Sequence, residues 1–198
     1  MQALLLSLAL LSPNQEPAVK PPAPEVVERA VKELSEAYSK TDAEAKMQAI
    51  VTNSEVLDPK VIEWIAKGAR DRVSEVQSTA INALRYMDHP DANKALVGLL
   101  RKDKKIKKDP ELYEALIIAV CQHADPKSFK LIADFKLNDE TRDTIRARVY
   151  GIARFRTTES VEALFDVMKR GRKGRLHAKM DEISMALTVL TGVDHGKS

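Results

Sequence analysis

The sequence predicts an all-α protein that forms a right-handed α-solenoid of about four antiparallel helix pairs. Three observations lead to this prediction: a composition poor in aromatic residues and glycine, helix-start signals along the whole chain, and a spacing of these signals that repeats. The chain has 198 residues, of which 44% are hydrophobic and 5% aromatic, with 7 glycines. This composition supports a packed core and disfavours a β-sandwich or a β-barrel, which are rich in aromatic residues and turn glycines.

Prolines that follow a capping residue mark several helix starts. Aspartate precedes Pro59, Pro110 and Pro126, and histidine precedes Pro90. An aspartate side chain accepts hydrogen bonds from the free amides of the first helical turn, and proline fits the first helical position because it has no amide proton to donate. We therefore expect helices to begin at these four prolines.

Other helix starts are predicted without proline. Thr41–Glu44 and Ser74–Gln77 have the pattern of capping boxes, and Asn138 and Thr157 are further N-cap candidates. Between these starts the apolar residues recur at helical spacing, and no segment of similar strength alternates with a period of two. We expect about ten helices of roughly 10–16 residues, joined by short turns.

The helices are predicted to repeat as pairs. The predicted caps Asp58, His89, Asp125 and Thr157 serve as register positions, which are 31, 36 and 32 residues apart. A large aliphatic residue stands eight residues before each of them, a small residue six before, and another large aliphatic residue seven after. The residues eight before are Ile50, Ile81, Ile117 and Val149. Those six before are Thr52, Ala83, Ala119 and Gly151, and those seven after are Ile65, Leu96, Ile132 and Leu164. Such a period is typical of a solenoid, in which each unit buries its apolar face against its neighbours.

Several segments resemble a known repeat family. They are Val73–Leu100, Asp109–Phe135 and Asn138–Met168, with a weaker match at Thr41–Lys67. These segments resemble HEAT repeats of the short bacterial type, and the ending Leu187–Gly192 is similar to the close of HEAT domains in exported bacterial proteins. The resemblance implies an armadillo-type superhelix that acts as a binding scaffold, and it implies no particular catalytic activity.

The N-terminal part is predicted to lie outside this fold. Residues 1–12 contain the apolar run Ala3–Leu11, which is too short for a membrane span of roughly 20 residues but fits the apolar core of a signal peptide. Residues 13–24 form a proline-rich linker, and residues 25–198 form the helical repeat domain. We expect an exported protein if residues 1–12 are a signal peptide. The alternative is an apolar helix that packs on the body of a cytoplasmic protein.

We find no catalytic motif, zinc-ligand spacing or phosphate-binding glycine loop in the sequence. The single cysteine, Cys121, ends an apolar run and is expected to be buried and inert. His177 and Asp181 would share a helical face, where a surface hydrogen bond is the simpler expectation than an acid–base pair. Trp64 is expected in the core, and the turn at Gly171–Gly174 either only joins two helices or lets the backbone approach a phosphate. We therefore predict a protein that is not an enzyme and holds no metal or cofactor.

Charge is distributed unevenly, although the formal net charge is only +3. Glu25–Glu63 contains nine acids and five bases, whereas Arg142–Lys179 contains eleven bases and four acids. Arg101–Lys108 adds six bases and one acid between two helices. Because equivalent loops of a solenoid project from the same edge, we predict one basic rim that binds a partner through charge complementarity. Its residues are Arg101, Lys102, Lys104, Lys105, Lys107, Lys108, Arg170, Arg172, Lys173 and Arg175.

The sequence thus predicts a non-catalytic interaction scaffold whose first expected partner is another protein. An acidic glycan, an anionic lipid or a nucleic acid is an alternative ligand for the basic loops. The alternative function is a nucleic-acid-binding protein related to HEAT-like bacterial DNA-repair glycosylases. That function requires a base-sized pocket with a carboxylate and aromatic residues for stacking, and the sequence shows neither. A structural spacer without a ligand is the third hypothesis.

Overall fold

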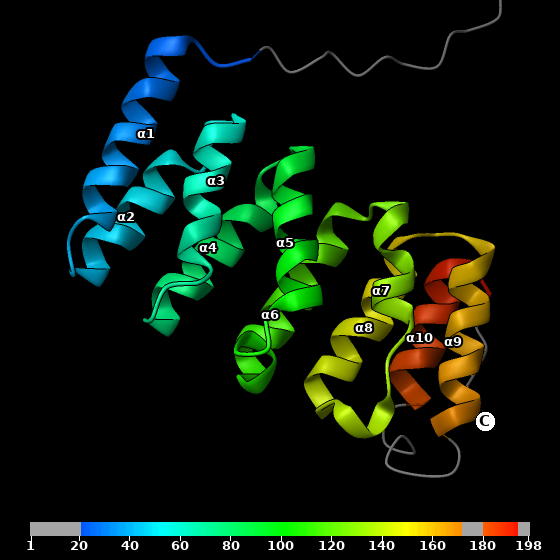
Figure 1. Cartoon of the computed structure of the whole chain (residues 1–198). Helices are drawn as coiled ribbons and strands as arrows, with labels where there is room; N and C mark the ends of the chain where they lie inside the picture. The colour runs from blue at the N-terminus through cyan, green and yellow to red at the C-terminus, as the bar shows by residue number, and fades with distance from the viewer. Residues whose placement is uncertain (1–20, 172–179, 194–198) are drawn as a thin grey trace, which may run out of the picture.

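The structure, a computed structural model, describes residues 21–171 and 180–193, and this part of the chain is helical and contains no β-strand. Segment 1–12 and residues 13–20 of the linker lie outside the described residues. Figure 1 shows the helices following one another in chain order from one end of the molecule to the other. Within the described part, no helix combines the length and the apolar composition needed to cross a bilayer.

Ten α-helices and three short 3-10 turns form the described part of the chain. They are α1 (Pro24–Tyr38), α2 (Ala43–Asn53), α3 (Pro59–Gly68), α4 (Ser74–Tyr86), α5 (Pro90–Lys102), η1 (Ile106–Lys108), α6 (Pro110–His123), η2 (Pro126–Ser128), α7 (Phe129–Ala133), η3 (Leu137–Asp139), α8 (Arg142–Arg154), α9 (Thr158–Gly171) and α10 (Met180–Thr191).

The helices contact one another in a regular order. α2, α4, α6, α8 and α10 pack in succession, and we call them the even-numbered row. On the other side of the molecule α1 packs on α3 and α3 packs on α5, while α7 and α9 pack on α8. The prediction of an all-α protein is therefore confirmed for the described residues.

The aliphatic residues at the register positions form the core between these helices. All eight of them have at most 1% of their surface exposed, and they belong to one continuous apolar cluster. Among the small residues, Ala119 and Gly151 are buried, Ala83 is half-buried and Thr52 is exposed. Thr52 is exposed because α2 is the first helix of the even-numbered row and has a neighbour on only one side within that row.

Four of the predicted caps are confirmed. The side chains of Asp58, His89 and Asp109 accept amide hydrogen bonds at the starts of α3, α5 and α6, over distances of 2.8–3.1 Å. Thr157 caps α9, where its hydroxyl accepts from the Ser160 amide at 3.3 Å. Each of these side chains satisfies an amide that has no partner inside its own helix.

At three other predicted starts the capping residue is wrong. Asp42 rather than Thr41 caps α2, because the aspartate carboxylate accepts the amides of the first turn. α4 begins at Ser74, so this residue lies inside the helix, and the N-cap position before it has no side-chain hydrogen bond. α8 begins at Arg142 behind a capping box made by Thr141, whereas Asn138 lies in the 3-10 turn η3.

Helix α7 is much shorter than expected. Asp125 accepts the Lys127 amide at 2.9 Å, but Pro126 begins a 3-10 turn and the α-helix that follows has only five residues. The chain then runs through an irregular segment, residues 134–141, before α8 begins. This unit of the repeat therefore has to be held in place by contacts other than those of a long helix.

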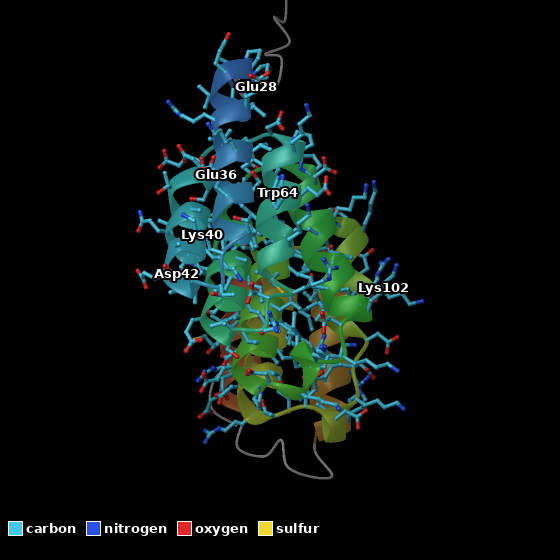
Figure 2. All side chains as sticks on the ribbon, turned by 60° about the vertical axis from the view of Figure 1, so that its left-hand side comes forward. Glu28, Glu36, Lys40, Asp42, Trp64 and Lys102 are labelled. Atoms are coloured by element: carbon cyan, nitrogen blue, oxygen red, sulfur yellow. The ribbon has the colours of Figure 1, made fainter. Side chains whose placement is uncertain are left out.

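The N-terminal helix covers the end of the core with a polar outer side. Glu28 and Glu36 lie on the exposed side of α1, as Figure 2 shows, while Leu34 on the opposite side is buried. A polar end helix shields the apolar surface that the last unit of a stack would otherwise expose. The last helix of the described part is α10.

Gly151 allows α6 and α8 to approach closely. A Cβ atom at this position would overlap the Cys121 Sγ atom and lie 3.1 Å from the Cys121 Cβ atom. Gly98 in α5 provides a contrast, because nothing lies within 4 Å of the position that its Cβ would occupy. The two glycines therefore respond differently to the same added methyl group.

We expect Gly151→Ala to lower the free energy of unfolding by about 1–3 kcal/mol, because overpacking forces the two helices apart. Gly98→Ala is the matched control and should raise it by about 0.5–1 kcal/mol, because alanine loses less backbone entropy in a helix. Urea unfolding followed by circular dichroism measures both changes. In the Cys121→Ala background the effect of Gly151→Ala should become smaller, and equal losses in both backgrounds would contradict the proposed contact.

Candidate functional site

The loop after α5 carries the densest cluster of positive charge in the described chain. We call the six basic residues Arg101, Lys102, Lys104, Lys105, Lys107 and Lys108 the cationic loop. Arg101 and Lys102 are in the last turn of α5, and the others belong to the connection to α6 and to the 3-10 turn η1. Lys102 projects from the side of the molecule in Figure 2.

The backbone of this loop is anchored. The Asp103 carboxylate accepts the amides of Lys105 and Ile106 at 2.9 and 3.1 Å. The Ile106 side chain is buried, with 1% of its surface exposed, and it belongs to the common apolar core. One apolar residue in a run of bases therefore fixes the loop on the body of the protein.

The charges of the cationic loop are exposed and unpaired. All six side chains are exposed, and none of them makes an ion pair with another described residue. The two aspartates beside them, Asp103 and Asp109, accept backbone amides at the starts of η1 and α6. A shallow cavity of about 570 Å³ lies beside the loop, between Lys105, Lys108 and Glu111. Such a loop attracts anions, because exposed cations without partners create a positive local potential.

The other half of the predicted basic rim is only partly described. Figure 1 shows the loop after α5 and the C-terminal end of α9 at the same edge of the molecule. Arg170 lies at that end of α9, but its charge is already partnered: Nε is 2.9 Å from the Asp166 carboxylate, and Nη1 donates to the Phe135 carbonyl oxygen at 2.8 Å. Arg172, Lys173 and Arg175 lie outside the described residues. Arg170 thus fastens α9 to the end of the α7 unit.

Three further bases lie at this edge, and two of them, Arg70 and Arg72, were missed by the sequence analysis. Arg70 and Arg72 lie in the turn between α3 and α4, and Lys169 lies in the last turn of α9; all three are exposed and make no ion pair with a described residue. The repeat register contains the missed signal. Arg70, Arg101 and Lys169 each stand twelve residues after a register position. Equivalent turns therefore carry equivalent bases.

A buried polar network is the second candidate for chemistry. Arg148 Nε donates to Glu140 Oε1 at 3.0 Å, and Arg148 Nη2 donates to the Tyr113 hydroxyl at 2.7 Å. Arg148 Nη1 donates to the carbonyl oxygens of Leu131 and Ile132 at 3.1 and 2.9 Å. The side chains of Arg148 and Glu140 are each 5% exposed. Burial raises the pKa of the Tyr113 hydroxyl, although the charge of Arg148 opposes this effect.

This network suits a structural role better than a catalytic one. The guanidinium closes the C-terminal end of the short helix α7 and ties residues 134–141 to α6 and α8. Its ring neighbour Phe135 lies between the guanidiniums of Arg148 and Arg170, at 4.9 and 5.5 Å. The donors of Arg148 are used on groups of the protein itself, so they are not directed at an open site.

The remaining candidate residues are also placed by the fold. Burial raises the pKa of the Cys121 thiol to about 12, so the thiol is protonated and unreactive at neutral pH. Trp64 is half-buried and packs on Tyr38, with the two ring centroids 5.9 Å apart. The Lys67 Nζ atom lies over its ring, 3.6 Å from the ring centroid. His177 lies outside the described residues, so its pairing with Asp181 cannot be placed. Among residues 21–171 and 180–193, no three His, Cys, Asp or Glu side chains are grouped so that they could hold a metal ion.

Neither the scan against protein-family models nor the search of curated proteins found a match to this chain. The function therefore has to be inferred from the residues of the chain itself.

We expect Arg148→Met to lower the free energy of unfolding by about 3–5 kcal/mol, because it leaves Glu140 buried without its counter-ion. Glu140→Gln in the same background removes the uncompensated charge and should recover part of this loss. Denaturant unfolding of the two single variants and the double variant measures the coupling. A double variant that loses the full sum of the two single effects would show that the pair does not interact.

Proposed function

We propose that this chain is a HEAT-like α-solenoid that serves as a non-catalytic scaffold for an acidic protein partner. The regular burial of the eight register aliphatics supports the solenoid, since equivalent residues fill equivalent places between successive helices. The stacking of the even-numbered row supports it as well, because each of its helices contacts the next one along the row.

One observation carries the proposed binding function: six exposed and unpaired bases stand on a loop that Ile106 and Asp103 anchor. An anchored loop loses little conformational entropy when a partner binds, so the electrostatic attraction is not offset by the cost of ordering the backbone. Long side chains remain mobile, which suits a partner with a broad acidic surface. Arg70, Arg72 and Lys169 extend the same kind of charge to equivalent turns.

Binding by such a loop releases counterions and steers the approach of an anion, so it weakens as salt rises. An acidic protein, an acidic glycan and an anionic lipid share this chemistry. A nucleic acid is the second candidate because its phosphates fit the same charges. A protein that acts on nucleic-acid bases would also need aromatic side chains on which the bases stack, and the cationic loop contains no aromatic residue.

We expect a variant with serine at all six positions of the cationic loop to keep its helicity but to bind poly-glutamate at least about tenfold more weakly at low salt. Fluorescence titration across a salt series measures this. The matched control replaces six other exposed bases with serine, namely Arg29, Lys32, Lys40, Lys60, Lys94 and Lys127. Equal losses in the two variants would mean that only net charge matters. Clear preference for duplex DNA over poly-glutamate would favour the nucleic-acid function.

Export is a second part of the proposal, and it rests on the apolar run Ala3–Leu11. In native extracts the mature protein should begin after residue 12, which mass spectrometry of the purified N-terminus determines. A native protein that retains Met1 would contradict a cleaved signal peptide. It would favour the alternative in which the apolar segment packs on the protein.

A further inference from the structure

The outer side of the even-numbered row exposes apolar side chains. Val51 in α2 is 58% exposed, Tyr86 at the end of α4 is 64% exposed and Tyr150 in α8 is 39% exposed. In α10, Met185 and Val189 are 59% and 66% exposed, and the Tyr150 hydroxyl lies 3.9 Å from the Met185 sulfur. Val51 and Tyr150 each directly follow a buried register aliphatic, whereas Ile118, at the same position in α6, is half-buried and packs on the core.

A groove of about 840 Å³ lies on this side of the molecule. It is lined by residues of α2, α4 and α6 and by the turns that follow α2 and α4, including Val51, Tyr86 and Ile118. Its volume is within the range of ligand-binding clefts in proteins. Val51 and Tyr86 lie on the neighbouring helices α2 and α4, and the axes of packed helices are about 8–10 Å apart, so the apolar face of one bound helix can contact both.

Arg85 in this groove has a donor without an acceptor. Its guanidinium lies 4.9 Å from the centre of the Tyr86 ring, and its Nε atom is inaccessible and makes no hydrogen bond. No ion pair joins Arg85 to another described residue. Because Nε is inaccessible, an acceptor on a bound peptide does not reach it, and Arg85 acts on a ligand through the positive charge that it adds to the groove wall.

Two acids give the groove its electrostatic preference. Glu55 and Asp88 line it from the turns after α2 and α4, and both are exposed and unpaired among the described residues. With Arg85 as the only base in the lining, the groove has a net negative charge. The groove therefore favours cationic ligands, whereas the cationic loop favours anions.

We propose that this groove binds a basic amphipathic helical segment of a partner protein. The apolar residues of the bound segment contact Val51, Tyr86 and Ile118, and its Lys or Arg side chains pair with Glu55 and Asp88. The uncharged apolar run Ala3–Leu11 of the chain itself would leave both acids unpaired, which disfavours it as the occupant. This proposal is independent of the cationic loop, so the six-serine loop variant should bind such a segment as the unchanged protein does.

The test uses two synthetic helical peptides, one of leucine and lysine and one of leucine and glutamate, with binding measured by fluorescence anisotropy. The lysine peptide should bind more tightly. Val51→Ser with Tyr86→Ser should weaken its binding by about tenfold or more, as truncation of central contact residues does. Both side chains are more than half exposed, so the fold should be kept. Phe165→Ser on α9, where the side chain is 38% exposed outside this groove, is the matched control and should change nothing.

The acids are tested in the same way. Glu55→Gln with Asp88→Asn should weaken the lysine peptide several-fold and remove most of the preference over the glutamate peptide, whereas Glu28→Gln with Glu36→Gln on α1 should not. Equal affinity for the two peptides, or equal loss in Phe165→Ser, would overturn the proposal. A tighter complex after deletion of residues 1–20 would assign the groove to the N-terminal segment instead. Dimers in sedimentation that the Val51 and Tyr86 changes abolish would assign it to a second copy of the chain.

Discussion

The structure depends on burial of aliphatic side chains between helices that cannot bury them alone. The side of α4 that carries Ile81, or of α6 that carries Ile117, is covered only when the neighbouring helices are in place. No long-range sheet pairing or disulfide contributes in the described residues, since Cys121 is free. Each helix of the row therefore depends on its neighbours for burial, and a helix at either end, which lacks a neighbour on one side, needs a polar outer side. At the N-terminal end the acidic outer side of α1 provides it.

The α7 unit departs most from this regularity, and a polar network compensates for it. A five-residue helix buries little apolar surface, so Ile132 alone keeps the register contact there while Arg148 binds the carbonyl groups that the short helix leaves free. Arg170 adds a further hydrogen bond from α9, to the Phe135 carbonyl oxygen. The two arginines give directional contacts where an apolar helix face is missing, and for Arg148 this places a charge in the interior beside Glu140.

The two proposed binding surfaces differ in charge because they lie on different sets of helices. The cationic loop follows an odd-numbered helix, where bases near the C-terminus interact favourably with the helix dipole. The groove lies on the even-numbered row and is bordered by turns that contain Glu55 and Asp88. A small protein with a net charge of only +3 can therefore present one cationic and one mildly anionic surface.

The sequence by itself determined the all-α class, the helix starts at Asp58, His89, Asp109 and Thr157, and the burial of the register aliphatics, because capping and helical periodicity act over a few residues. It also located the cationic loop, since a run of six bases is visible without coordinates of any kind. Only the tertiary structure decided that Arg170 is already paired with Asp166, that Arg148 closes the end of α7, and that Val51, Tyr86 and Ile118 line one groove. The groove residues are more than 30 positions apart, and Arg148 lies 16 and 17 residues after the carbonyl groups that it binds, so local sequence patterns do not predict these contacts. The pair of Arg170 with Asp166 is local, at i and i+4, but the sequence alone does not show which of several possible partners a surface arginine takes.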